Sequence, residues 1–168
     1  GWEPPCIYDA DALYHLAQNP RLLASLPPSA VLTPHPGEMA RLLGMGMGEL
    51  QADRVAAARR FLAKHPQILV LKGAGTLVGQ GGEGQGLELH LSPISAPNLS
   101  VGGSGDVLAG LMAALLARGL PPLQAACLGV YWHGISGLSL AKDYPGRGNL
   151  PTEIADALPR IHKEHATC

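Results

Sequence analysis

The sequence is poor in aromatic residues and in charge. Aromatic side chains make up 4% of the 168 residues and charged side chains 15%, and the formal net charge is -1. Hydrophobic residues at 46% exclude a disordered polar chain, and the near-neutral balance excludes the basic surface with which proteins bind nucleic acid. We therefore expect a folded domain that has no nucleic-acid partner.

Cysteines and long hydrophobic runs are also scarce. The three cysteines, Cys6, Cys127 and Cys168, are odd in number and far apart, so they form neither a disulfide framework nor a paired metal site. The longest apolar stretch, 107–117, is too short to cross a bilayer, and no signal-peptide pattern opens the chain. These absences predict a soluble, cytoplasmic protein without a membrane partner.

Glycine and proline are abundant instead, at 22 and 15 residues. With so few aromatics, the core must be built from Leu, Val and Ala in closely packed layers joined by tight turns. A chain of this length buries about two-thirds of its unfolded surface in one core. No repeat or linker divides the sequence, so we expect a single domain over residues 1–168.

Short apolar runs alternate with helical patterns along the chain. The four consecutive apolar residues of 68–71 are typical of a central, parallel strand that is buried on both faces. Helices are expected over residues 10–26, 49–64, 106–118, 122–142 and from Pro151, a hairpin over 76–79 and 87–91, and a loop over 33–37. The alternation predicts a layered α/β domain with a mainly parallel central sheet flanked by helices, whose ligands bind beyond the carboxyl ends of the strands.

The densest signal is the run N-L-S-V-G-G-S-G-D at 98–106, which leads straight into a helical segment. The amides of Gly103, Ser104 and Gly105 would face a phosphate at the positive end of that helix. Asp106 could then accept the proton of a substrate hydroxyl that attacks a phosphoryl group. The alternative is that Asp106 caps the helix and the glycines turn the chain, which is the commoner origin of an isolated G-x-G-D.

Two further loops follow apolar strands. The first offers a cation, flexible amides and a hydroxyl, from Lys72, Gly73, Ala74, Gly75 and Thr76, although an ordinary turn with an exposed lysine has the same composition. In the second, T-P-H-P-G-E at 33–38, two prolines hold His35 in a stiff loop. A lone loop histidine is usually just solvated. On the long helix, His133 either lies near a nucleotide pocket or packs between helices, and packing is favoured.

Four motifs, in this order, resemble the NAD(P)H-hydrate dehydratase family of ribokinase-like small-molecule kinases. They are D-A-D-A-L at 9–13, T-P-H-P-G-E at 33–38, L-K-G-A-G-T at 71–76 and G-G-S-G-D-V-L-A-G at 102–110. Each motif is weak alone, and together they are specific. The resemblance implies a ribokinase-like layered domain that binds a hydrated nicotinamide nucleotide and an adenine nucleotide.

The resemblance also implies roles for the motif residues. His35 and Asp106 would contact the NAD(P)H hydrate, with Asp106 as the base, while Lys72 to Thr76 and Gly105 would contact the adenine nucleotide. Phosphate would pass from ADP or ATP to the hydroxyl of the hydrate, and its expulsion would regenerate NADH or NADPH. Mg²⁺ normally accompanies the phosphates in this family.

The sequence departs from the family pattern in two ways. Tyr14 stands where the family often has Asn, and the early strand with its glycine-rich loop has no counterpart. The match is thus to the C-terminal portion of the domain, with N-terminal strands missing, and the sheet surface left open predicts a homo-oligomer. Asp9 and Asp11 are second-rank candidates for a role near the metal or the substrate. The alternative is that they cap a helix.

The sequence is also compatible with two other functions. One is a ribokinase-like kinase that acts on a small hydroxymethyl compound, because the same amides and carboxylate suit any hydroxyl phosphorylation. The other is a non-catalytic nucleotide-binding fragment. No metal site is assigned to His162, His165 and Cys168, because a frayed chain end does not orient ligands.

Overall fold

The computed structural model describes residues 4–84 and 86–165, and within these the side chains of residues 162, 164 and 165 are left aside, so the C-terminal histidine and cysteine group lies outside the described side chains. A sheet of five strands has the order β1-β2-β3-β4-β5. The strands are β1 Ile7–Tyr8, β2 Val31–Leu32, β3 Ile68–Leu71, β4 Leu77–Gln80 and β5 Glu88–Leu91. The layered α/β architecture is confirmed. The sheet is mixed, because β1, β2 and β3 are parallel and the expected hairpin of β4 and β5 adds antiparallel pairings.

The middle strand β3 separates two hydrophobic cores. Leu69 and Leu71 belong to the core on one face of the sheet, whereas Ile68 and Val70 belong to the core on the other face. All four side chains are at most 1% exposed, as the apolar run predicts. Each such burial contributes about 1.5–3 kcal/mol of transfer free energy, so this strand anchors both layers.

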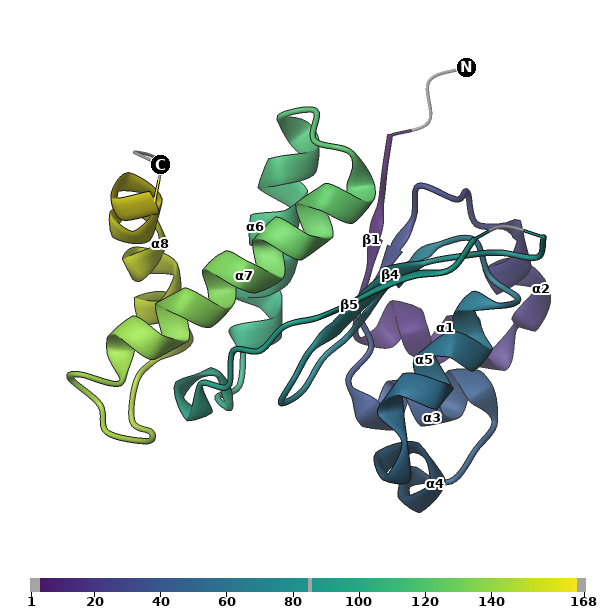
Figure 1. Cartoon of the computed structure of the whole chain (residues 1–168), viewed down its shortest axis with the longest axis horizontal. Helices are drawn as coiled ribbons and strands as arrows, with labels where there is room; N and C mark the ends of the chain where they lie inside the picture. The colour runs from purple at the N-terminus through teal and green to yellow at the C-terminus, as the bar shows by residue number, and fades with distance from the viewer. Residues whose placement is uncertain (1–3, 85, 166–168) are drawn as a thin grey trace.

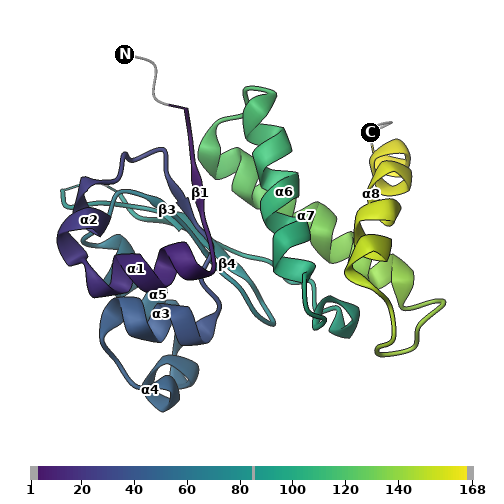
Figure 2. The same ribbon diagram turned by 180° about the vertical axis from the view of Figure 1, so that it is seen from behind.

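Five short helices cover the first face of the sheet (Figures 1 and 2). They are α1 Asp11–Gln18, α2 Pro20–Ser25, α3 Pro36–Leu43, α4 Met47–Ala52 and α5 Arg54–Leu62. The prediction of single helices over 10–26 and 49–64 is wrong, since each is interrupted. Pro20 starts α2 at a position where no amide hydrogen is needed, and the Asp53 side chain caps α5 by accepting from the Ala56 amide at 2.8 Å.

The expected loop at 33–37 instead becomes the start of a helix. Pro36 is the first residue of α3, where a fixed φ and a missing N–H suit the helix. His35 is the N-cap: its Nδ1 accepts from the Gly37 amide at 2.9 Å, and Glu38 Oε2 accepts from the His35 amide at 2.7 Å. This reciprocal capping box outweighs the helix-breaking tendency of the prolines.

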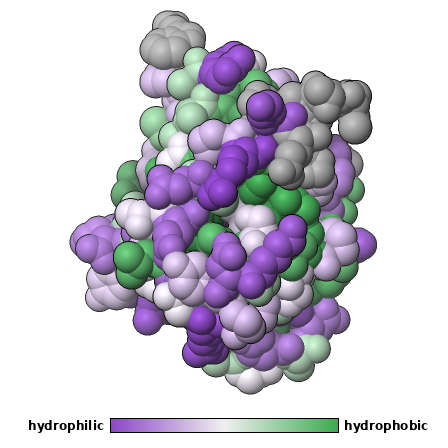
Figure 3. Space-filling view, turned by 90° about the vertical axis from the view of Figure 1, so that its left-hand side faces the viewer, coloured by the Kyte–Doolittle hydropathy of each residue, from purple (hydrophilic) through white to green (hydrophobic). Residues whose placement is uncertain are grey.

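Three longer helices form the second layer: α6 Ser104–Ala117, α7 Pro122–Leu140 and α8 Pro151–His165. α6 and α7 share the core on the second face of the sheet, and α8 packs on both of them (Figure 2). None of the described helices is long and apolar enough to cross a membrane. Hydrophilic residues cover most of the face that carries α8, with hydrophobic ones between them (Figure 3).

Candidate active site

The three parallel strands end at one edge of the sheet, and each is followed by a residue that the sequence singled out. Asp9 follows β1, the loop to His35 follows β2, and Lys72 follows β3. The Lys72 amide donates to the Pro34 carbonyl at 2.8 Å, and the Thr33 amide donates to the Tyr8 carbonyl at 3.1 Å. These bonds hold the loops side by side at the edge where α/β folds bind ligands.

An ion pair between Asp9 and Lys72 lies under the start of α6. Lys72 Nζ donates to Asp9 Oδ1 at 2.7 Å, and both side chains are largely shielded from solvent. A Cβ atom built on Gly105 would lie 3.4 Å from Lys72 Nζ and 3.8 Å from Asp9 Oδ2. The absence of a side chain at residue 105 therefore lets the helix start approach the ion pair. Asp9, a second choice from the sequence, belongs to this group, whereas Asp11 is exposed in α1.

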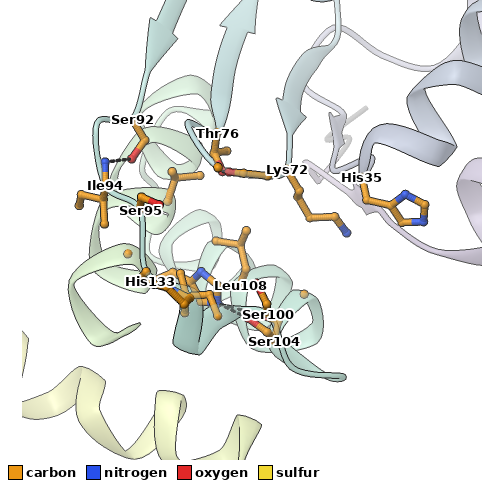
Figure 4. A pocket seen from close by; sticks show the side chains of 18 of the residues that line it. His35, Lys72, Thr76, Ser92, Ile94, Ser95, Ser100, Ser104, Leu108 and His133 are labelled. Atoms are coloured by element: carbon orange, nitrogen blue, oxygen red, sulfur yellow. Dashed lines mark hydrogen bonds between the residues drawn. The ribbon is translucent and has the colours of Figure 1, made fainter. Parts of the chain in front are cut away.

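A cavity of about 480 Å³ opens between the strand ends, the second helical layer and the segment 92–101 (Figure 4). Seven of the predicted site residues line it, namely His35, Lys72, Gly73, Ala74, Thr76, Ser104 and Gly105. The other three, Gly75, Gly103 and Asp106, do not. The structure thus brings the three predicted loops together around one cavity.

The start of α6 presents free amides beside this cavity. The Ser104 and Val107 amides donate to the carbonyls of Val101 and Gly103, whereas those of Gly105 and Asp106 have no acceptor within the described part of the chain. Gly103 is the N-cap, with a left-handed φ of 86°. Within the described residues no side chain caps this helix, so the alternative in which Asp106 is the cap is wrong, although Gly103 does turn the chain. This helix end is open to an anion.

His35 occupies the opposite rim of the cavity. Its ring is fixed by the capping bonds to Nδ1, and Nε2 lies 3.4 Å from Glu38 Oε1. The side chain remains 52% exposed, so it is neither a freely solvated loop residue nor enclosed. Lys72 lies between His35 and the helix-borne residues Ser104 and His133 in Figure 4.

Arg54 supports the Lys72 loop from behind, a role that its place in the sequence does not indicate. The guanidinium donates to the carbonyls of Leu71 and Lys72 at 3.1 Å each and to that of Ala74. Burial lowers the pKa of Arg54. Arg54 lies in the segment 49–64 with two other arginines, and nothing in its spacing distinguishes it from the exposed Arg59 and Arg60. Only the fold reveals that the two terminal nitrogens of its guanidinium meet a row of three carbonyls.

His133 joins the two long helices at the other end of the cavity. The ring lies between α6 and α7, as favoured from the sequence, and also lines the cavity. Its Nε2 lies 3.0 Å from the Ser104 carbonyl oxygen and 3.1 Å from Ser104 Oγ. Burial, helped to a smaller extent by the Lys72 charge, lowers the pKa of His133 to about 4. The imidazole is therefore neutral near pH 7.

The segment 92–101 closes this end by packing against two glycines of α7. A Cβ atom on Gly134 would lie 2.9 Å from Ile94 Cγ2, and one on Gly137 would lie 2.6 Å from Leu99 Cγ. Ile94 and Leu99 line the cavity, as do Leu108 and Val130 from the helices. We call the end at the strand loops, with Lys72, the polar end of the cavity, and the end at α7 the apolar end, although serine side chains also line the latter (Figure 4).

No group of three or more His, Cys, Asp or Glu side chains is placed to hold a metal ion anywhere in residues 4–84 and 86–165, as far as the side chains are described. Mg²⁺ is usually held by one or two carboxylates together with substrate phosphates. Asp9, which pairs with the cavity-lining Lys72, and Asp106, in the first turn of α6, could supply the one or two carboxylates of that mode.

Comparison with known proteins gives one consistent family. The family model described as NAD(P)H-hydrate dehydratase matches residues 2–160. The ADP-dependent (S)-NAD(P)H-hydrate dehydratase of Neisseria meningitidis is 40% identical over 159 residues, which cover 92% of this chain and 52% of that protein. The bifunctional NAD(P)H-hydrate repair enzyme Nnr of Moorella thermoacetica is 40% identical over 157 residues, covering 94% of this chain and 29% of that protein.

Solved structures agree with the sequence matches. The ADP/ATP-dependent NAD(P)H-hydrate dehydratase of Bacillus subtilis, co-crystallised with ATP/Mg²⁺, is 32% identical with a TM-score of 0.73, covering 80% of this chain and 47% of that one. A ribokinase-like superfamily protein of Enterococcus faecalis is 31% identical with a TM-score of 0.77, covering 94% and 52%. The chain spans about half the length of these relatives or less. On the match over residues 2–160, it belongs to the NAD(P)H-hydrate dehydratase family.

Proposed function

We propose that this chain dehydrates the hydrated forms of NADH and NADPH in a reaction driven by ADP or ATP. The observation that carries the proposal is the convergence of the open α6 start, Lys72 and the 72–76 loop on one cavity at the carboxyl ends of parallel strands. The activities named for the Neisseria and Bacillus relatives support it.

In the proposed reaction, phosphate moves from the nucleotide to the hydrate. The hydroxyl oxygen attacks the terminal phosphorus of ADP or ATP, Asp106 accepts the hydroxyl proton, and AMP or ADP leaves. The C–O bond then breaks, phosphate departs, and loss of a proton from the neighbouring ring carbon restores the double bond of NADH or NADPH. Lys72 and the amides of Gly105 and Asp106 would stabilise the charge on the transferred phosphate.

The remaining predicted residues divide between the two ligands. The amides of Gly73, Ala74 and Gly75, with Thr76, would hold the nucleotide, and His35 would contact the hydrate from the opposite rim. Bound Mg²⁺ would neutralise phosphate charge, with Asp106 and Asp9 as the carboxylates available to it. A cytoplasmic location would supply both ligands.

The deciding experiment follows absorbance as purified protein is mixed with NADH hydrate and either ADP or ATP. We expect NADH to form only when nucleotide and Mg²⁺ are both present. Calorimetry with ADP runs in parallel. Binding of ADP without NADH formation would reduce the proposal to nucleotide binding, and phosphorylation of a small hydroxymethyl compound would favour the kinase.

We also infer self-association through the open edge of β1. Along the described residues β1 pairs only with β2, which leaves its outer backbone groups available to another chain. Light scattering on a sizing column should give the mass of a dimer. A monomeric mass at high micromolar concentration would contradict this.

A further inference from the structure

We propose that His133 reads the base of the bound nucleotide, its Nδ1 accepting a hydrogen bond from the 6-amino group of adenine and disfavouring purines with a 6-oxo group. This inference rests on the proposed function, because it requires a purine nucleotide in the cavity. It makes His133 a specificity-determining residue.

The contacts of the ring decide which nitrogen carries the proton. Nε2 lies 3.0 Å from the Ser104 carbonyl oxygen, which can only accept, so Nε2 must donate. A neutral imidazole protonated at Nε2 has an acceptor at Nδ1. Since burial lowers the pKa of His133 to about 4, the ring stays in this form near neutral pH.

The acceptor faces open space in the cavity. Hydrogen bonds of the ring to the described residues all involve Nε2. The fully buried side-chain atoms without a partner in that part of the chain are Arg54 Nε, Gln67 Oε1 and Asn98 Oδ1. Nδ1 is therefore unpaired without being enclosed, although His133 as a whole is only 7% exposed, and the cavity is the space that this residue lines. A donor from a ligand would satisfy it.

The surroundings suit a purine ring rather than a phosphate. Leu108, Val130 and Ile94 line the same end of the cavity and offer apolar contacts. Lys72 lies toward the strand loops (Figure 4), and the free amide of Gly105 is beside it. Ser104, which His133 holds through its carbonyl, is the first residue of α6 and directly precedes Gly105. The start of α6 therefore positions both His133, which would contact the base, and the Gly105 amide, which would contact the phosphate.

The chemistry predicts discrimination at one position of the base. Adenine places an N–H donor where hypoxanthine and guanine place a carbonyl oxygen. An acceptor held rigidly opposite that oxygen would leave two lone pairs facing each other in a partly buried site. ADP and IDP are a matched pair of probes. They differ only in that adenine has a 6-amino group, whereas hypoxanthine has a 6-oxo group and a proton on N1.

The test measures ADP and IDP affinities by calorimetry for the wild-type chain and for His133→Gln. Glutamine keeps a donor for the Ser104 carbonyl, and its amide oxygen does not coincide with the position of the ring Nδ1, so the acceptor that we assign to the base is lost. We expect the wild-type chain to bind ADP about tenfold more tightly than IDP, and the variant to bind both within about threefold of each other. His90→Gln is the control, because His90 is exposed on β5 and pairs with Glu88. It should change neither affinity.

A second measurement keeps the proposal testable if His133→Gln fails to fold. In wild-type protein labelled with ¹⁵N-histidine, ADP should shift the Nδ1 resonance of His133 in the direction of a hydrogen-bond acceptor, and IDP should not. Equal wild-type affinities for ADP and IDP, or discrimination retained in His133→Gln, would overturn the role of His133 while leaving the proposed function intact. Failure to bind any nucleotide would overturn both.

Discussion

The helices on the two faces of the sheet differ in how much of their surface is buried. On the first face, short helices α1 to α5 bury one side and expose the other, as α5 does with Arg59 and Arg60. On the second face, α7 contacts the sheet, α6, α8 and the 92–101 segment. Buried residues therefore lie on most sides of α7. The first layer therefore supports the cavity from outside, whereas the second layer forms part of its wall.

The two ends of the cavity are held in place by different kinds of interaction. The polar end depends on directed contacts: the Asp9–Lys72 ion pair and the bonds from Arg54 to backbone carbonyls. The apolar end depends on close approach at Gly134 and Gly137 and on one neutral histidine. Substitutions in the two regions should consequently fail in different measurements.

The largest effect is expected at Asp106. Asp106→Asn keeps the size of the side chain and removes the proton acceptor, so turnover should fall by about 10²–10⁴-fold. ADP affinity should remain within about threefold of wild type, because the helix amides are untouched. Steady-state kinetics and calorimetry on the same preparation give both values. Turnover within a few-fold of wild type would contradict the assignment of Asp106 as the base.

Stability should depend on pH through His133 in the second layer. The pKa of His133 is about 4 in the folded protein and 6.5 when unperturbed, so between these pH values the unfolded chain binds a proton that the folded chain does not. Lowering the pH from 7 to 4 should therefore remove about 3 kcal/mol of unfolding free energy through this residue.

Urea unfolding of the wild-type chain and His133→Gln at both pH values isolates that contribution. The stability difference between the two proteins should change by about 3 kcal/mol in favour of the variant at pH 4. Burial also lowers the pKa of His65, but His65 is present in both proteins, so its effect cancels. A difference that does not vary with pH would show that His133 is not held neutral by burial.

A side chain at residue 105 should block the polar end. Gly105→Val would place atoms against Lys72 Nζ, 3.4 Å from the position of a Cβ atom, and cover the free amides. We expect ADP affinity to fall about tenfold or more. Gly110→Val is the matched control on the same helix, because nothing lies within 4 Å of its Cβ position. Equal affinities in the two variants would exclude a phosphate site at the start of α6.

The smallest effect is expected from the supporting layer. Arg54→Lys replaces a planar group that bonds three carbonyls with a single ammonium, so the 72–74 loop should lose its fixed position. We expect ADP affinity to fall about threefold with little change in kcat at saturating ADP. Arg59→Lys, an exposed change on the same helix, is the control. A fall in kcat alone would contradict a role in nucleotide binding.

The sequence predicts the second layer better than the first, for physical reasons. Long apolar segments such as 122–142 have few alternative structures, and Gly119, with a φ of 88°, ends α6 at the expected place. The first layer is governed by local competition among caps, so Pro20 and Asp53 divide helices that hydrophobic spacing alone would join. His35 illustrates the same point, since a side-chain cap turned an expected loop into a helix.

The candidate site follows a similar division. Motifs place two of the loops at strand ends and the third at the start of a helix, and seven of the predicted residues line the cavity that the fold forms between them. Sequence spacing does not show the direction of side chains or the partners of buried groups. The Arg54 bonds to carbonyls and the bonds of His133 to Ser104 depend on segments that are distant in sequence, so they could not be derived from it.

The packing of Ile94 on Gly134 means that the dimensions of the cavity are controlled from its back wall. The 92–101 segment lies where it does because α7 offers it two positions without side chains. A methyl group added at residue 134 would push Ile94 forward into the space meant for a ligand, without altering any polar contact. Substitution of these α7 glycines, which have no side chain to contact a ligand, could thus restrict the size of the ligands that the cavity accepts.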